Sequence, residues 1–481
     1  MIKKNSLLVI VMMLLMLCGA MNNICTVFLL PLCIMLSFVV AYSAVKENDS
    51  NICFYILLIL TLQNFLIGVG ASIFDNSSES IKLFTQIPFI FTLITYICTL
   101  FRKKERINHR RKWFILFLLT IAFSFVSGLG SIQAIVVNIR NMITFYLAFE
   151  IGKYFLDEKE KIDRFFNKYN ILMKFVLYIG IILLIGGAEL YEIIGIDKVY
   201  LAKGSLMTKG TLPGRFYTNL FSKTFVRLGS LYYEPVNLAY FFVGPILYNI
   251  FYKTENKKFN EMRIINIIES VIGLALTFGK GGYLVIGMVF AYLVLYKINI
   301  IFFAVIKKKS IRNISIALIL ILACVMSTKY FKSISAASAP HFWGIIGTFN
   351  SVKQRPYGYG IGKGGNMAAV FNEDSNISFS ASSKWLTSGG ESAIMSFMYQ
   401  LGIQGIIAMI LLLLSLRKTK KGNINFLNIF SVMPVIVFIV GVFQENTFTP
   451  QCIIPIMLIQ GCCYNMNNKD KINEGEERDK A

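Results

Sequence analysis

The residues best suited to chemistry are charged side chains at the edges of long apolar runs. In Phe225 to Tyr248, FVRLGSLYYEPVNLAYFFVGPILY, Arg227 and Glu234 precede an apolar run long enough to enter a bilayer. A charge at that place usually pairs, reaches the interface or binds a substrate. The planar guanidinium of Arg227 suits binding of a phosphate through two parallel hydrogen bonds. The alternatives are contact with lipid phosphates and a plain ion pair with Glu234.

Two further cations lie beside or within apolar runs. Lys280 is in LTFGKGGYL (276–284), a glycine-flanked turn, where it is either an interfacial anchor or a second cation facing the same cavity. Arg140 lies eight residues into the run 132–154, or about 12 Å at 1.5 Å per residue. A charge at that depth needs a partner or a water-filled cavity. Arg140 is therefore part of a site or structurally paired with Glu150 or another acid.

The C-terminal half adds an arginine and a carboxylate. Arg355 opens the glycine-rich segment RPYGYGIGKGG (355–365). No strand precedes these glycines, which argues against a dinucleotide-binding turn. The segment therefore predicts only a flexible loop that tolerates an anion. Glu391 heads the apolar run 391–416. There it either complements the helix dipole or faces the arginines as a general base.

Composition identifies the class of protein. The chain has 481 residues, and its 56% hydrophobic and 15% charged residues are too apolar for a soluble protein of that length. The net charge of +22 would suggest a nucleic-acid partner in a soluble chain. Here the basic residues gather in short loops between apolar runs, which indicates membrane topology and no nucleic acid. All nine cysteines lie in or beside apolar runs, so neither a disulfide framework nor a metal site is expected.

We expect an all-α, polytopic integral membrane protein, with residues 1–481 as a single membrane domain. About 12–14 transmembrane helices are predicted, since some of the apolar runs are marginal in length. The runs are 6–20, 24–44, 52–72, 83–101, 113–130, 132–154, 171–188, 233–252, 264–279, 282–305, 312–328, 391–416, 425–442 and 450–466.

Basic loops predict the orientation. The segment FRKKERINHRRK (101–112) is the strongest cytoplasmic signal, and the loops 153–170, 253–263, 307–312 and 417–423 fall on the same side. Both termini are then cytoplasmic. Two long outer loops remain, at about 189–232 and 329–390, and loops of that length are usually functional. Both are moderately basic, which an anionic substrate on the outer face would explain.

These segments resemble the O-antigen polymerase and ligase superfamily, which includes Wzy-type polymerases. The resemblance covers roughly 130–416 and rests on the order of four stretches: RLGSLYYEPVNLAYF, LTFGKGGYL, RPYGYGIGKGG and GESAIMSFMYQLGIQG. It implies transfer of a glycan from an undecaprenyl-pyrophosphate donor to an acceptor sugar. The reaction would take place on the outer face of a bacterial cytoplasmic membrane, with no metal, nucleotide or other cofactor.

The resemblance also implies roles for residues. Arg227 and Lys280 would hold the pyrophosphate and stabilise it as a leaving group, with Arg140 and Arg355 as further contacts, while Glu391 activates the attacking hydroxyl. Lys280 stands where the family commonly has arginine. Glu391 stands where ligases tend to have histidine, which favours a polymerase.

We therefore expect a polymerase for a capsule, exopolysaccharide or O-antigen. Its partners would be the lipid-linked oligosaccharide, the bilayer and other polysaccharide-assembly membrane proteins. The alternatives are a ligase of the same superfamily, and a flippase or exporter that moves the lipid-linked unit without chemistry. A transporter is expected to have internal symmetry, short outer loops and midplane charges.

Overall fold

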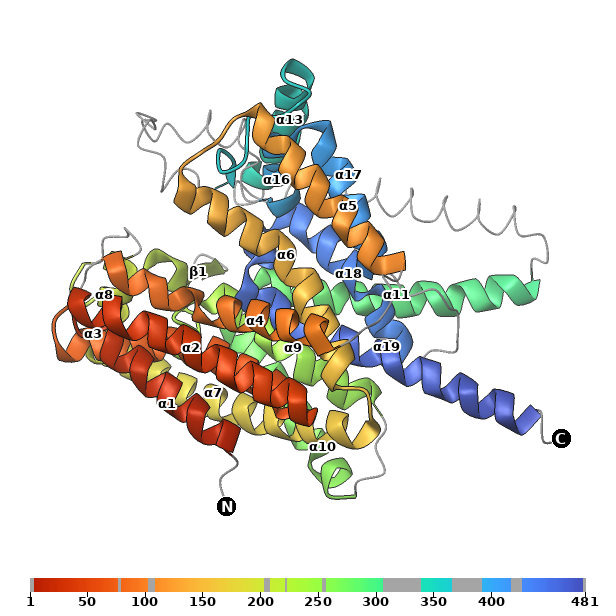
Figure 1. Cartoon of the computed structure of the whole chain (residues 1–481), viewed down its shortest axis with the longest axis horizontal. Coiled ribbons are helices and arrows are strands. Elements are labelled where there is room, and N and C mark those ends of the chain that lie inside the picture. Colours follow the sequence, from red (N-terminus) through yellow and green to blue (C-terminus); the bar gives the residue numbers. More distant parts are fainter. Residues whose placement is uncertain are drawn as a thin grey trace.

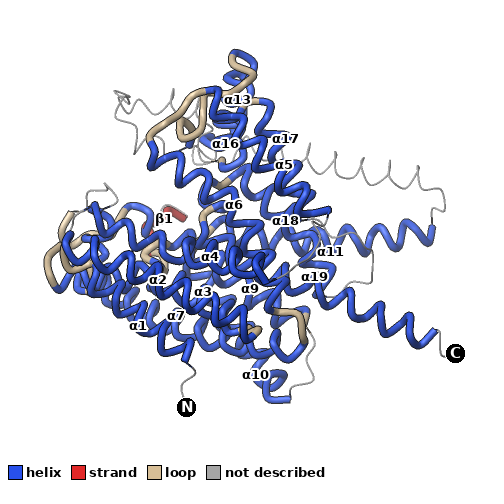
Figure 2. The backbone as a smooth tube through the Cα atoms, in the orientation of Figure 1, coloured by secondary structure: helices blue, strands red, loops and turns tan. Residues whose placement is uncertain are grey.

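The described part of the chain is almost entirely helical (Figures 1 and 2). The computed structural model describes residues 4–76, 79–102, 109–202, 208–220, 223–252, 257–305, 339–365, 392–416 and 426–478. The prediction of a mostly helical chain is confirmed.

Most helices of the N-terminal half follow the predicted apolar runs. The helices of this half are α1 (Lys4–Gly19), α2 (Asn23–Glu47), α3 (Asn51–Ile73), η1 (Glu79–Gln86), α4 (Ile87–Arg102), α5 (His109–Phe123), η2 (Ser124–Ser127), α6 (Ile132–Phe155) and α7 (Lys159–Ile193). Helix α7, however, begins inside the predicted basic loop 153–170, twelve residues before the run 171–188. Side-chain caps fix two of the starts, because Asn22 accepts from the amide of Cys25 and Ser131 accepts from that of Ala134.

The first predicted outer loop has structure of its own. It contains α8 (Ile196–Ala202), η3 (Gly214–Phe216), β1 (Tyr217–Leu220), β2 (Lys223–Val226) and η4 (Ser230–Tyr232). The two strands form an antiparallel hairpin in which Tyr217 faces Val226. This register decides which charged side chains meet beyond the open end of the hairpin.

The C-terminal half departs from the prediction in two places. Its elements are α9 (Pro235–Phe251), α10 (Lys257–Thr277), α11 (Lys280–Val305), α13 (Ala339–Gln354), α16 (Ala393–Leu401), α17 (Ile403–Leu416), α18 (Phe426–Phe443), η5 (Glu445–Phe448) and α19 (Pro450–Arg478). Helix α13 lies inside the predicted second outer loop. The single run predicted at 391–416 is broken at Gly402, whose φ of 65° and ψ of −142° suit glycine alone. The predicted run 312–328 lies outside the described residues.

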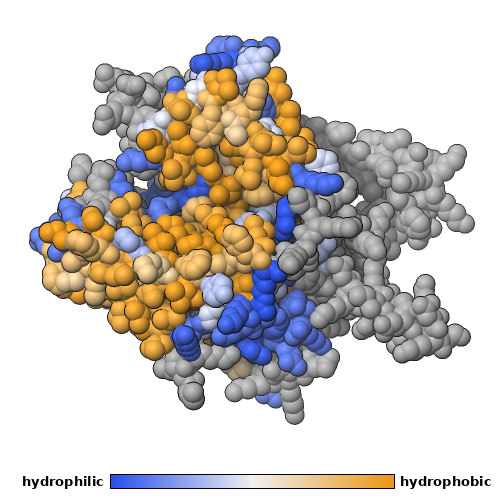
Figure 3. Space-filling view, viewed as in Figure 1, coloured by the Kyte–Doolittle hydropathy of each residue, from blue (hydrophilic) through white to orange (hydrophobic). Residues whose placement is uncertain are grey.

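Several described helices have the length and composition of membrane spans. Five of them could cross a bilayer: Asn23–Glu47, Asn51–Ile73, Ile81–Arg102, Ile132–Phe155 and Lys159–Ile193. Large apolar side chains are exposed along the outer faces of α1, α2, α5, α7 and α10, among them Leu14, Phe28, Met35, Leu119, Ile185 and Ile264. Figure 3 shows broad hydrophobic areas on the visible face. A surface this apolar indicates association with a membrane.

The interior is built around α6, α9 and α19. Helix α19 packs along α6 and also contacts α9 and α18. Two glycines bring the α6 and α19 backbones together: a Cβ on Gly152 would overlap the carbonyl oxygen of Leu458, and one on Gly461 would overlap that of Phe149. Small residues at a helix crossing are the usual way to pack membrane helices closely.

Gly461→Ala is therefore expected to destabilise the protein. The added methyl meets backbone, which cannot rotate away, and such overpacking typically costs about 1–3 kcal/mol. The measurement is the unfolding temperature in detergent. Gly287→Ala is the matched control, since Gly287 is an exposed glycine of α11 with open space around its Cβ position. A Gly461→Ala protein as stable as Gly287→Ala would contradict the close contact between α6 and α19.

Candidate functional site

Arg227 is fixed by the hairpin and by the end of α10. Its amide donates to the Phe216 carbonyl (2.7 Å), which extends the hairpin ladder by one residue. Its side chain donates from Nε to the carbonyl of Thr277 (2.8 Å) and from Nη1 to that of Arg215 (3.0 Å). These bonds use two of its five N–H donors. Burial lowers the pKa of Arg227, so an anion bound beside it would stabilise its charged form.

Arg215 and Glu234 form an ion pair next to Arg227. Arg215 Nη1 lies 3.4 Å from Glu234 Oε2, and attraction to Glu234 is the main cause that raises the pKa of Arg215. The Tyr200 hydroxyl lies 3.3 Å from the same oxygen. The other oxygen, Oε1, is buried and has no hydrogen-bond partner among the described residues. A buried carboxylate oxygen in that state can accept a hydrogen bond from a bound ligand.

Local backbone structure positions Glu234. It is the N-cap of α9 with an extended backbone (φ −152°, ψ 101°), as expected for a residue before proline, and Pro235 begins the helix. The preceding turn is anchored to neighbouring helices, because Ser230 Oγ donates to the carbonyl of Val176 (2.6 Å) and Asn64 Nδ2 to that of Tyr232 (2.6 Å). The carboxylate is thus held on a rigid support.

Lys280 lies on the same α10–α11 turn that binds Arg227. It is the first residue of α11, three residues after Thr277, whose carbonyl accepts from Arg227. Its side chain is exposed. The structure therefore brings two of the predicted anion-binding residues, Arg227 and Lys280, to one turn.

A second carboxylate approaches from the turn between α18 and α19. Glu445 is near enough to Arg215 to contribute to raising the pKa of that arginine. It also lies against the glycine segment, since a Cβ on Gly365 would overlap Glu445 Oε1. Neither Glu445 nor Arg215 is selected from the sequence as a candidate site residue. Their proximity arises from tertiary structure, which composition does not encode.

Arg140 has neutral partners. Its Nη1 donates to Gln86 Oε1 (2.7 Å), and its Nε and Nη2 donate to Asn141 Oδ1 (3.2 and 3.0 Å). The pairing with Glu150 that the sequence left open is not found, because Glu150 instead pairs with Lys153 at 3.2 Å. Amide oxygens orient a guanidinium without neutralising it, so the positive charge of Arg140 is available to an anion.

The glycine segment 355–365 is packed tightly and is not the flexible loop that the sequence predicted. The amides of Tyr359 and Gly360 donate to the carbonyls of Tyr399 and Gln400, both at 3.0 Å. Gly360, with φ +106°, lies so close to the backbone of Gly128 that a side chain would overlap it. Arg355, which opens the segment, is exposed and donates from Nη2 to the Ser127 carbonyl (3.3 Å).

Not all of the predicted site residues are joined by contacts. Within the described ranges, no hydrogen bond links Arg140 or Arg355 to Arg227. Glu391 lies outside the described residues; the next residue, Ser392, is the N-cap of α16. Figure 3 shows a hollow with hydrophilic side chains between two hydrophobic blocks, next to the position of β1 in Figure 1.

Comparison with known proteins adds no relative. The chain matches no protein-family model, no curated protein and no solved structure at a significant level. A functional assignment therefore depends on the residues and their geometry.

Proposed function

We propose that this protein is a membrane glycosyltransferase that polymerises undecaprenyl-pyrophosphate-linked repeat units into a surface polysaccharide. It would act on the outer face of a bacterial cytoplasmic membrane, with both termini on the inner side. The observation that carries the proposal is the cluster at the hairpin end. There Arg215 and Arg227 meet Glu234, which has one buried oxygen without a partner among the described residues.

The cations of this cluster suit a pyrophosphate. Arg227 has donors beyond the two that bind carbonyls, and Lys280 lies on the adjoining turn. Positive charge that is already in place stabilises a leaving group whose negative charge grows in the transition state. Arg140 and Arg355 remain predicted anion contacts.

The proposed reaction is a substitution at the anomeric carbon of the donor glycan. The acceptor hydroxyl gives its proton to a carboxylate, and its oxygen forms the new glycosidic bond. The bond from the anomeric carbon to the pyrophosphate oxygen breaks, and undecaprenyl pyrophosphate departs with the electron pair. Among the described residues, we take Glu234 as the base, because its buried Oε1 has no hydrogen-bond partner there. Glu391 is the base that the sequence predicts.

Purified protein incubated with a lipid-pyrophosphate-linked repeat unit tests this proposal. We expect a ladder of lipid-linked products on a gel without any nucleotide added. The ligase alternative predicts transfer to a different acceptor and no ladder. Intact substrate with neither ladder nor transfer product would contradict a glycosyltransferase.

One observation favours the flippase alternative. Lys174 of α7 and Glu269 of α10 pair at 3.2 Å near the middle of their helices, and the Tyr178 hydroxyl donates to the same carboxylate. Charges within membrane helices often mark a transport path. Translocation of the lipid-linked unit across a liposome membrane, in the absence of a ladder, would select this function.

A further inference from the structure

A second basic cluster lies at the opposite end of α6 from the hairpin. It lines a shallow, partly open pocket that encloses room for about one water molecule. The pocket is formed by Tyr96, Thr99, Leu100, Arg111, Glu150, Lys153 and Tyr154. These residues come from the ends of three helices: the last two turns of α4 and of α6, and the first turn of α5. Lys153 is about 20 Å along α6 from Arg140. The pocket is thus separate from the proposed catalytic cluster.

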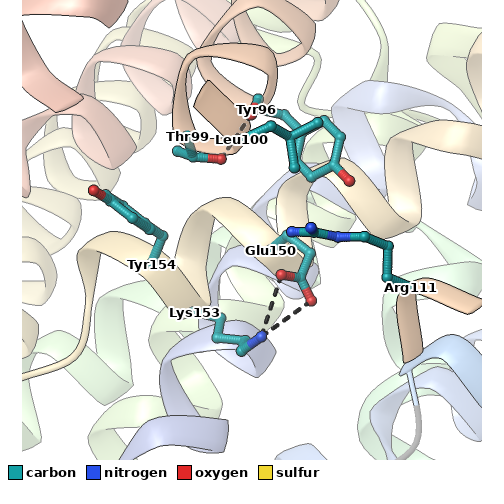
Figure 4. A pocket seen from close by; sticks show the side chains of 7 residues that line it. All are labelled: Tyr96, Thr99, Leu100, Arg111, Glu150, Lys153 and Tyr154. Atoms are coloured by element: carbon teal, nitrogen blue, oxygen red, sulfur yellow. Dashed lines mark hydrogen bonds and ion pairs between the residues drawn. The ribbon is translucent and has the colours of Figure 1, made fainter. Parts of the chain in front are cut away.

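Positive charge exceeds negative charge around this pocket. Figure 4 shows Arg111 pointing toward Glu150, which also binds Lys153 Nζ at 3.2 Å. Among the described residues that line the pocket, Glu150 is the sole carboxylate. Beside them lies Arg110, which adds a third cation. An anion at the mouth of this pocket therefore meets a net positive charge.

Arg110 is held inside the protein. Only 8% of it is exposed, and its guanidinium carbon lies 3.7 Å from the centre of the Tyr464 ring and 5.4 Å from that of Phe149. In the sequence, Arg110 belongs to a basic loop that predicts membrane topology. A residue with that role alone could remain exposed. Aromatic faces hold a cation in place without cancelling its charge. The cluster is therefore built into the packing between α5, α6 and α19.

The surroundings of the pocket indicate which anion it takes. Phe101, next to Leu100 of the pocket, is 85% exposed, and Leu119 is 58% exposed two turns along α5 from Arg111, so exposed apolar side chains begin beside the pocket and continue along the helix. A phospholipid has this same arrangement, with a phosphate at the level of the helix ends and acyl chains along apolar helix faces. A soluble phosphate would gain nothing from the apolar flanks.

We propose that this pocket binds the phosphate of an anionic phospholipid, with Arg111 and Lys153 as its principal contacts and Arg110 as a fixed charge behind them. The site does not depend on the proposed transferase activity. On this proposal, the basic residues at 109–111 bind a phospholipid phosphate in addition to any role in membrane topology.

Native mass spectrometry of detergent-purified protein tests the site, with phosphatidylglycerol and phosphatidylcholine of the same acyl chains as probes. We expect one phosphatidylglycerol to be retained in preference to phosphatidylcholine. Arg111→Gln should weaken its binding by about tenfold, the loss expected for one charge-assisted contact. Lys112→Gln is the matched control, because Lys112 is exposed in the same turn and does not line the pocket.

Other outcomes would overturn the assignment. Equal retention of the two lipids, or equal weakening by Lys112→Gln, would contradict a specific site. Displacement of phosphatidylglycerol by millimolar inorganic phosphate would show that the pocket takes a free anion and not a lipid. Lys153→Gln provides the same test if Arg111→Gln does not fold, and unchanged lipid binding in a folded variant of either residue would overturn the proposal.

Discussion

Arg227→Ala is expected to abolish polymer formation while the protein still inserts into the membrane. Removing a preorganised donor to a developing negative charge typically costs about 10²–10³ in rate. The change also removes two side-chain bonds that attach the hairpin end to α10 and to the Arg215 carbonyl. The measurement is the yield and length of lipid-linked product formed by purified protein, together with its unfolding temperature.

Two further variants separate charge from geometry. Arg227→Lys keeps the positive charge but loses the planar fork, so we expect product to be detectable but greatly reduced. Lys223→Ala removes an equal charge from an exposed position on the same hairpin and should leave activity nearly unchanged. If Lys223→Ala reduced activity as much as Arg227→Ala, the loss would come from the overall positive charge of the hairpin. The specific role of Arg227 would then be wrong.

Helix positions could be predicted because a bilayer imposes a simple requirement. A segment that crosses it must be apolar and must satisfy its backbone hydrogen bonds internally, so long apolar runs become helices. The predicted runs 24–44, 52–72 and 132–154 correspond to α2, α3 and α6. The number of spans and the sides of the loops stay predictions.

Helix breaks and loop structure could not be predicted in the same way. The run 391–416 is apolar on both sides of Gly402, and the break there depends on packing of the carbonyl of Pro356 and the amide of Gly358 against that glycine. Helix α13 contains a proline and two glycines, which are typical of a loop. Both features arise from contacts between segments far apart in the chain.

The candidate site was predicted in part for the same reason. A charged residue beside an apolar run can be recognised from the sequence without knowing its neighbours in space. Arg227 and Lys280 could be selected for that reason. Which charges meet is decided by hairpin register, and the register places Arg215 beside both Arg227 and Glu234. From the sequence, Arg227 is the expected ion-pair partner of Glu234. The observed partner, Arg215 of η3, has no sequence feature that links it to Glu234.

Glu234→Gln is expected to reduce the rate of polymerisation by about 10²–10⁴, the usual contribution of a positioned general base. Glutamine has nearly the same shape and can still accept a hydrogen bond from Tyr200, so the turn before α9 should stay folded. It cannot take a proton from the acceptor hydroxyl. We therefore expect kcat to fall while the KM for the lipid-linked donor changes little, because only the transition state loses an interaction.

Glutamate-to-glutamine substitutions at two other carboxylates test which residue is the general base. Glu445→Gln alters a group that approaches Arg215 from η5, and it should shift the KM more than kcat if Glu445 only tunes the binding cations. Glu391→Gln tests the base that the sequence predicts. A large loss of kcat in Glu391→Gln, with the kcat of Glu234→Gln near that of the wild type, would transfer the role of base to Glu391. In that case Glu234 would serve to fix Arg215 beside the pyrophosphate, and its loss would weaken donor binding without slowing the bound reaction.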